Sequence, residues 1–184
     1  MADVTCDVTY NVAVSLDGFI SPTNGSSDWI VPDDSVNFQA LYSRFDMFIM
    51  GRKTYDAVVA SGMNDLMMQG SASNRVYVLS RTLEPKEHPG ITIIRDERYL
   101  DLIRDESMKK SCSVWIMGAG WLAAQGLNAG LLTSIEVAIM PVVLGNGTKL
   151  LDGLDDANSL QHQTVQHLQQ SGIIMASYSI KHGA

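Results

Sequence analysis

The sequence predicts an α/β fold with a mostly parallel mixed sheet, helices on both faces and antiparallel strands at the C-terminal end. Three observations support this prediction. Apolar segments typical of strands alternate with helix-like segments through the first two thirds of the chain. The last strand-like segments have no helix between them, so they can pair antiparallel. The 184 residues, 46% of them apolar, contain no internal repeat or long linker, so we expect one domain over residues 1–184.

The N-terminal elements are read from turn signals and apolar patterning. A strand is expected at residues 8–15, because β-branched and apolar residues lead there into an Asp-Gly turn. A polar, turn-rich segment at 21–27 then leads to Pro32, with the aspartates after it close to a helix start. The apolar residues of 36–45 fall roughly on one helical face, which predicts a helix there.

The same alternation continues to the end of the chain. Residues 61–74, rich in Gly, Ser, Asn and Met, are expected to form a loop around a short helical turn. The other expected strands are 47–50, 76–79, 91–94, 114–117, 135–144 and 173–180, and the other expected helices are 52–60, 99–110 and 121–129.

The composition excludes some classes of partner. A net charge of −7 opposes binding to a polyanion, because phosphate recognition along a groove needs clustered Lys and Arg. A single nucleotide is different, since a few local basic residues and backbone N–H groups can bind its phosphates. We therefore expect a small-molecule substrate and no nucleic-acid partner.

Neither a membrane nor a metal is indicated. The start of the chain lacks a basic region followed by an apolar one, and no window approaches the length of a membrane span. Cys6 and Cys112 lie far apart without a CxxC motif, so we expect no disulfide framework and no zinc site. The histidines are scattered in polar segments. These features predict a soluble, cytoplasmic protein.

The first candidate motif is Gly51-Arg52-Lys53-Thr54, which directly follows a predicted strand. The glycine permits a tight turn, and the helix that follows offers unpaired N–H donors. Arg, Lys and Thr side chains add charge-assisted contacts to a phosphate. The alternative is a solvated basic helix start without a ligand.

Two further motifs also follow predicted strands. In Gly118-Ala119-Gly120 the small residues let the backbone approach a pyrophosphate closely, although a glycine turn needed for packing explains them equally. Ser80 and Arg81 provide a hydroxyl and a guanidinium for a further phosphate, or a capping Ser with a surface Arg. Ligands of open α/β sheets gather at the carboxyl ends of strands, where all three motifs lie.

These residues resemble the dihydrofolate reductase superfamily. The chain is especially similar to the branch typified by the C-terminal reductase domain of the bifunctional riboflavin-biosynthesis protein RibD. The resemblance covers about residues 7–180 and rests on five segments in order: VAVSLDGFIS, FIMGRKTY, VYVLSR, VWIMGAGWLA and PVVLGNG, with Trp29 after the first. It implies a dihydrofolate-reductase-like fold, NADPH as the cofactor and the pairing of two chains into a homodimer.

The resemblance also implies roles for individual residues. Leu144 and Gly145 would lie near the substrate mouth. The implied cofactor residues are Ala13 and Ile20 beside the nicotinamide, Gly51, Arg52, Lys53 and Thr54 at the phosphates, Ser80 and Arg81 at the adenosine 2′-phosphate, and Gly118, Ala119, Gly120, Trp121 and Leu122 around the pyrophosphate.

A carboxylate for catalysis is implied by one spacing. In the folate enzymes a Trp, two residues, a Pro and then a carboxylate two positions on place the substrate-anchoring acid, and Trp29 and Pro32 repeat this spacing and single out Asp34. A carboxylate beside the ring can raise the basicity of the nitrogen that is protonated as hydride arrives. The alternative for Asp34 is a helix N-terminal carboxylate. Asp17 is a second candidate, although an Asp-Gly turn uses such a residue for local hydrogen bonds.

The departures from the family concern the substrate. The family diglycine is Gly118-Ala119 here, Ala123 replaces a tyrosine, and Phe19 replaces a basic residue. These changes point away from dihydrofolate and from a phosphorylated pyrimidine. Phe19, Trp29 and Phe38 form a candidate apolar wall for a flat ring, or are ordinary core residues.

The expected function is therefore an NADPH-dependent reductase of a planar nitrogen heterocycle, pterin-like or pyrimidine-type, as in folate or riboflavin metabolism. The alternative is a nucleotide- or flavin-binding module of the same fold without turnover.

Overall fold

The computed structural model describes residues 6–68, 75–96, 98–109 and 112–181. The strands are β1 Cys6–Ser15, β2 Phe19–Ser21, β3 Met47–Gly51, β4 Val76–Leu79, β5 Thr92–Ile94, β6 Cys112–Ile116, β7 Ser134–Met140, β8 Thr148–Lys149, β9 Leu160–Leu168 and β10 Ile173–Ile180. The helices are α1 Phe38–Tyr42, α2 Arg52–Ala60, α3 Asn64–Met68, α4 Tyr99–Lys109 and α5 Gly120–Asn128.

Eight of these strands form one mixed sheet in the order β5-β4-β3-β6-β1-β7-β10-β9. The strands from β5 to β7 are parallel, and β10 is antiparallel to both of its neighbours. The two remaining strands, β2 and β8, make a small antiparallel pair. The predicted α/β class, with a mostly parallel sheet and antiparallel C-terminal strands, is confirmed.

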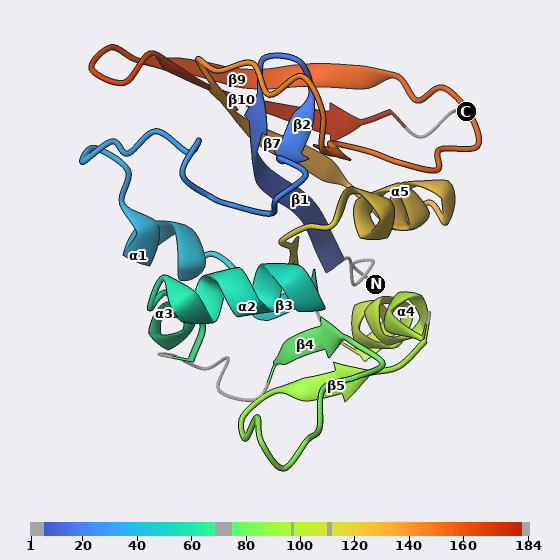
Figure 1. The fold of residues 1–184 in the computed structure, drawn as a ribbon. Helices are drawn as coiled ribbons and strands as arrows, with labels where there is room; N and C mark the ends of the chain where they lie inside the picture. The colour runs from blue at the N-terminus through green and yellow to red at the C-terminus, as the bar shows by residue number, and fades with distance from the viewer. Residues whose placement is uncertain (1–5, 69–74, 97, 110–111, 182–184) are drawn as a thin grey trace.

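Helices cover both faces of the sheet, as predicted. On one face, α4 and α5 pack on a core that includes Tyr10, Ile103 and Leu127. On the other face, α1, α2 and α3 pack on an aromatic cluster that includes Phe48 and Trp115. Figure 1 shows α4 and α5 to the right of the view and α1, α2 and α3 toward the left.

Most predicted elements agree closely with the structure, and two differ for local reasons. The helix predicted at 36–45 is shorter, because the side chain of Asn37 caps it by accepting a hydrogen bond from the N–H of Ala40 at 2.9 Å. The strand predicted to reach residue 144 ends at Met140, before Pro141, which has no N–H to donate. Residues 69–74 of the predicted loop and residue 110 of a predicted helix lie outside the described residues.

The strand β9 was not predicted. Of its residues, only Leu168 is buried, and the others are exposed on both faces. The sequence therefore lacks the apolar alternation by which strands are recognised. This segment becomes a strand because it pairs with β10 along its whole length, which satisfies the backbone groups of both.

The cysteines correct an expectation. Cys6 and Cys112 are separated by 106 residues, yet they are the first paired residues of the adjacent parallel strands β1 and β6, with Cα atoms 4.6 Å apart. They form a disulfide. The expectation that no disulfide forms was wrong, because strand register brings together residues that sequence spacing keeps apart. The cysteines therefore do not support the predicted cytoplasmic location.

No helix within the described residues is both long and apolar enough to cross a membrane.

Candidate functional site

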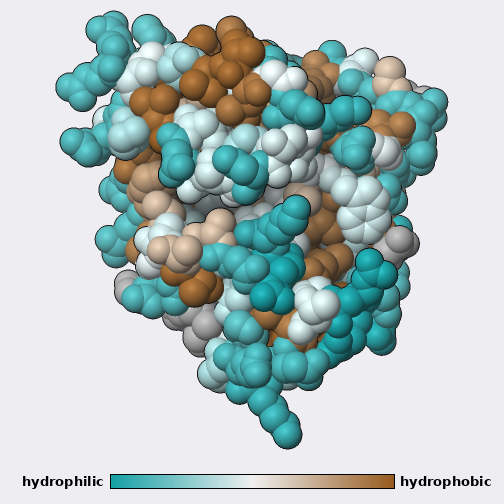
Figure 2. Space-filling model, in the orientation of Figure 1, coloured by the Kyte–Doolittle hydropathy of each residue, from teal (hydrophilic) through white to brown (hydrophobic). Residues whose placement is uncertain are grey.

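The three predicted phosphate motifs lie at the carboxyl ends of β4, β3 and β6, which are consecutive strands of the sheet. The N–H of Gly51, the last residue of β3, donates to the carbonyl oxygen of Gly118, after β6, at 3.3 Å. The guanidinium of Arg52 donates through Nη1 to Oγ1 of Thr82, after β4, at 3.1 Å. The structure therefore brings the three motifs together. Figure 2 shows a groove across the middle of this face, between α2 and the β1–β2 segment.

Two helices begin at this edge with unpaired donors. Gly51 is the N-cap of α2 and Ala119 is the N-cap of α5, and neither helix has a side-chain cap or an acidic residue in its first turn. The first N–H groups of each helix and the positive end of its dipole are thus available to an anion. This arrangement can bind the phosphates of a nucleotide without a large positive charge.

The three glycines of the site differ in the structural constraint that acts on each of them. A Cβ on Gly120 would lie 2.2 Å from the carbonyl oxygen of Lys149, so packing alone requires glycine there. Gly118 has a φ of +113° and forms a cis peptide with Ala119, and an added Cβ would lie 3.2 Å from Oγ1 of Thr54. Nothing lies within 4 Å of a Cβ built on Gly51. The space beside Gly51 is therefore open to a ligand.

The basic side chains of α2 are exposed. Arg52 pairs through Nε with the carboxylate of Asp56 at 2.8 Å, one turn further along the helix. Such an exposed ion pair is weak, so a phosphate can compete for the guanidinium. Lys53 is exposed beside it, and Thr54 is partly buried.

Ser80 and Arg81 are arranged differently from each other. Oγ of Ser80 accepts hydrogen bonds from the N–H groups of Thr82 at 3.2 Å and Leu83 at 3.1 Å, so this buried hydroxyl holds the turn after β4. Arg81 is exposed on that turn, and its carbonyl oxygen accepts a hydrogen bond from Nη1 of Arg95 at 2.9 Å. The turn presents the guanidinium of Arg81 more openly than the hydroxyl of Ser80.

The predicted nicotinamide and pyrophosphate residues separate into two groups. Ala13 is partly buried on the sheet face that carries Trp29, whereas Ile20 packs against the core beneath α4 and α5. The side chain of Leu122 is buried in that core, so only its backbone can face a ligand. Trp121 remains exposed beside Gly153.

Asp17 holds two loops together. Its carboxylate accepts hydrogen bonds from Oγ of Ser15 at 2.6 Å and from the N–H groups of Leu144 at 3.0 Å and Gly145 at 2.7 Å. These bonds, led by that of Ser15, lower the pKa of Asp17 from 3.8 to about 2. The structure thus gives this carboxylate, and the two N–H groups predicted near the substrate mouth, a role in joining the β1–β2 turn to the 141–147 loop.

Asp17→Asn should destabilise the protein at neutral pH, and the difference from wild type should fade in acid. Because the pKa in the folded protein lies below 3.8, the ionised carboxylate stabilises the fold above that pH, and this contribution is lost as the pH falls toward 2. Urea unfolding of both proteins at a series of pH values measures the difference. A difference that stays constant down to pH 2 would exclude ionisation of Asp17 as its cause.

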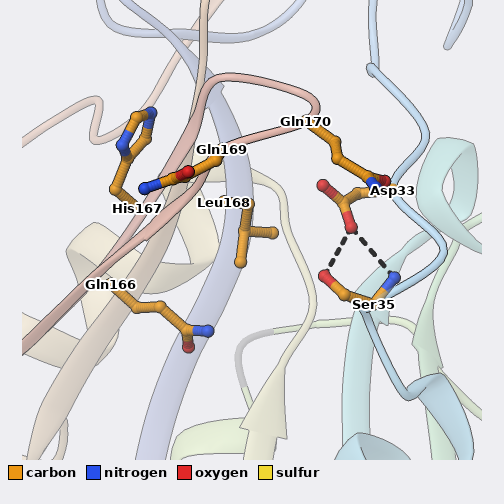
Figure 3. Close-up of a pocket in the computed structure, with 7 residues that line it drawn as sticks. All are labelled: Asp33, Ser35, Gln166, His167, Leu168, Gln169 and Gln170. Atoms are coloured by element: carbon orange, nitrogen blue, oxygen red, sulfur yellow. Dashed lines mark hydrogen bonds between the residues drawn. The ribbon is translucent and has the colours of Figure 1, made fainter.

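Asp33 and Asp34 lie in a turn and not at a helix start, because α1 begins only at Phe38. The carboxylate of Asp33 accepts hydrogen bonds from Oγ of Ser171 at 2.6 Å and from the N–H of Ser35 at 2.9 Å, and these lower its pKa. Figure 3 shows Asp33 and Ser35 facing each other beside the β9–β10 turn. Asp34 is exposed and lines a shallow pocket with Pro32.

The predicted aromatic wall is only partly assembled. Trp29 is half-buried and packs with Ala13 against the cluster of Met140, Leu168 and Ile173. Phe19 lies on β2 opposite Lys149, and Phe38 is 42% exposed at the start of α1.

A polar cluster near Ala13 was not predicted from the sequence. Glu136 on β7 pairs in register with Asn11 on β1, whose Nδ2 donates to Glu136 Oε2 at 2.6 Å. Arg44 donates from Nη1 to Oε2 of Glu136 at 3.1 Å and from Nη2 to Oε1 at 2.5 Å. The signal in the sequence was a charged residue inside an apolar strand, since strand interiors rarely hold an unpaired charge.

Comparison with known proteins identifies relatives of this chain in sequence and in structure. The family model of the RibD C-terminal domain matches residues 7–174. Two uncharacterised Bacillus subtilis proteins are similar: YyaP is 26% identical over 93% of each chain, and YwjB is 26% identical over 87% of this chain and 91% of its own.

Solved structures share the fold at low identity. A candidate riboflavin biosynthesis protein from Shewanella sp. PV-4 has a TM-score of 0.74 and 22% identity, covering 96% of this chain and 99% of its own. Dihydrofolate reductase from Enterococcus faecalis, solved with NADP(H), has a TM-score of 0.64 and 12% identity, covering 96% of this chain and 97% of its own. The predicted dihydrofolate-reductase-like fold is confirmed. The domain boundaries, the pairing of two chains, the cytoplasmic location and the roles of individual site residues stay predictions.

Proposed function

Because the chain belongs to the family of the RibD C-terminal domain, we propose that it is a reductase that transfers hydride from NADPH to a planar nitrogen heterocycle, pterin-like or pyrimidine-type. The main supporting observation is the meeting of two uncapped helix N-termini at the carboxyl ends of β3 and β6. The open space beside Gly51 fits phosphates approaching these N-termini.

The positions of the residues suggest which part of the dinucleotide each of them would bind. The N-terminus of α2, with Arg52, Lys53 and Thr54, would hold phosphate oxygens, and the N-terminus of α5 would hold the pyrophosphate. Arg81 would bind the adenosine 2′-phosphate, because it is exposed on the turn after the next strand and can donate two parallel hydrogen bonds.

A bound NADPH would supply the hydride for the carbon of a ring C=N bond and would leave as NADP⁺, while the ring nitrogen would take up a proton. The protein's part is to hold the ring against the sheet, exclude water and keep a proton source beside the nitrogen. Trp29 and Ala13 provide an apolar surface for that ring.

Isothermal titration with NADPH and NADH tests the proposal directly. We expect NADPH to bind more tightly than NADH, and failure of both to bind at high concentration would overturn it. Oxidation of NADPH against a panel of pterins and pyrimidines then tests turnover. Binding without turnover on any of them would favour the alternative, a nucleotide- or flavin-binding module.

Arg81→Ala should weaken NADPH binding about tenfold or more and leave NADH binding nearly unchanged, since a hydrogen bond to a charged group contributes about 1.5–3 kcal/mol. The two affinities are measured by the same titration. Arg104→Ala is a matched control, because Arg104 is also an exposed arginine but lies on α4, where it pairs with Asp101. An equal loss for both nucleotides would contradict the role of Arg81.

A further inference from the structure

The sheet face under α1 changes from apolar to polar across β1, β7, β10 and β9. At the carboxyl end of β7, Met140 forms a covered apolar cluster with residues of β9 and β10. The strand registers then define two rows across these strands, each on the same face. The first row is Ala13, Ala138, Met175 and Gln166, and the second row is Asn11, Glu136, Ser177 and Thr164. On this face the first row therefore has small side chains on β1 and β7, and the second row has polar side chains throughout.

The charged member of the polar row is held from two sides. Glu136 receives one hydrogen bond from Asn11 and two from Arg44, which follows α1. Its side chain is only 21% exposed, whereas that of Arg44 is 50% exposed. The carbonyl oxygen of Asn11 in turn accepts a hydrogen bond from Nε1 of Trp115 at 2.9 Å. The side chains of Glu136, Asn11 and Arg44 thus form a hydrogen-bonded cluster, in which the guanidinium is the part most exposed to solvent.

This cluster lies beside Ala13, one of the two residues that the family resemblance places at the nicotinamide. Ala13 follows Asn11 by two positions on β1, so both side chains lie on one face, roughly 7 Å apart along the strand. Ala13 is paired with Ala138, and both are small side chains that are only partly buried. A ring placed over this pair would reach Glu136 in the next row. Asp34, in contrast, lies in an exposed turn beside Pro32 and Gln170.

The chemistry of the cluster favours an uncharged ligand. Glu136 and Arg44 neutralise each other, so an anionic group gains little from the guanidinium. The carboxylate can accept from a ring N–H, and the guanidinium and the Asn11 amide can donate to a carbonyl oxygen. Together they complement the edge of a cyclic amide or amidine, in which an N–H stands next to a C=O or C–NH₂ group.

We propose that Glu136, Arg44 and Asn11 bind the amide or amidine edge of the substrate ring, with Glu136 rather than Asp34 as the substrate-facing acid. This inference rests on the proposed function.

The experiment measures binding of pterin, and of pteridine as the same ring without the amide edge, to protein saturated with NADP⁺. We expect wild type to bind pterin more tightly than pteridine. Glu136→Gln should weaken pterin binding about tenfold or more, so that the preference over pteridine is lost, while NADP⁺ binding stays unchanged. Arg44→Lys, which keeps the charge but loses the paired geometry, should show a smaller loss of the same kind.

Two control variants separate this role from a structural one. Glu106→Gln removes a carboxylate that is 16% exposed and pairs with Arg75 at the start of β4, so it should leave the pterin preference intact. Asp34→Asn should also leave it intact. A loss of the pterin preference in Asp34→Asn, with no loss in Glu136→Gln, would overturn the inference. So would wild-type protein that binds NADP⁺ but does not bind pterin more tightly than pteridine. Failure of wild type to bind NADP⁺ would instead overturn the proposed function. If Glu136→Gln does not bind NADP⁺, the test rests on Arg44→Lys: a reduced pterin preference in that variant supports the inference, and an unchanged preference overturns it.

Discussion

Removal of the Cys6–Cys112 disulfide is expected to lower the free energy of unfolding by about 4–5 kcal/mol. The bond closes a loop whose ends are 106 residues apart, and a cross-link over such a loop restricts the unfolded chain strongly, by about 4.7 kcal/mol in the chain-entropy treatment. Urea unfolding of the wild type with and without dithiothreitol measures the effect. The Cys6→Ala/Cys112→Ala variant should match the reduced wild type and should not respond to the reductant.

Cofactor binding should be much less sensitive to this bond than stability is. The cysteines are the first residues of β1 and β6, whereas the proposed phosphate site lies at the opposite, carboxyl ends of the parallel strands. We therefore expect the double variant to bind NADPH as the wild type does wherever it is folded. Two free thiols in wild-type protein denatured without reductant would show that the bond is not formed and would remove the basis of this prediction.

Gly120→Ala is expected to destabilise the protein by about 1–3 kcal/mol and to abolish NADPH binding. The new Cβ would lie 2.2 Å from the carbonyl oxygen of Lys149 and 2.7 Å from that of Leu150, so either α5 or the 149–150 segment must move. The segment is held by Tyr10, whose hydroxyl donates to the Leu150 carbonyl oxygen at 2.9 Å, and by the Leu150 N–H, which donates to the Gly18 carbonyl oxygen at 2.9 Å. The N-terminus of α5 is therefore displaced from the phosphate site.

Gly51→Ala provides the matched control for packing. Gly51 precedes α2 as Gly120 begins α5, but nothing lies within 4 Å of a Cβ placed on it and its φ is −80°. Stability should change by no more than about 0.5 kcal/mol. NADPH binding should still weaken, because the methyl group enters the space reserved for a phosphate. Equal destabilisation by both substitutions, measured by thermal and urea unfolding, would contradict the packing argument.

The order of the motifs along the chain was sufficient to predict the edge of the sheet that carries the site. Short apolar strands lead to Gly51, Ser80 and Gly118, and each is closed by a glycine or a polar turn, so these signals are local. Parallel strands place their carboxyl ends on one edge of a sheet, so three motifs that each follow a parallel strand lie at the same edge. Local signals were sufficient for the strands 76–79 and 173–180 and for the helix 52–60, whose bounds agree with the structure.

The roles of individual carboxylates could not be predicted in this way. Asp17 and Asp33 carry no sequence mark that separates a ligand contact from a loop contact, and their partners Leu144, Gly145 and Ser171 lie more than a hundred positions away. Glu136 interrupts an apolar strand, but only the pairing of β7 with β1 and the end of α1 supply Asn11 and Arg44 as its partners.

The sequence by itself thus determined the α/β class, the order of most elements and the edge of the sheet where the phosphate motifs meet, because periodicity and turn chemistry act over a few residues. Tertiary structure alone decided three features: that the polar segment 160–168 is a strand, that Cys6 forms a disulfide with Cys112, and that Glu136 pairs with Arg44. Each of these depends on the register between strands distant in sequence, and register is set by the packing of the whole sheet and not by any local pattern.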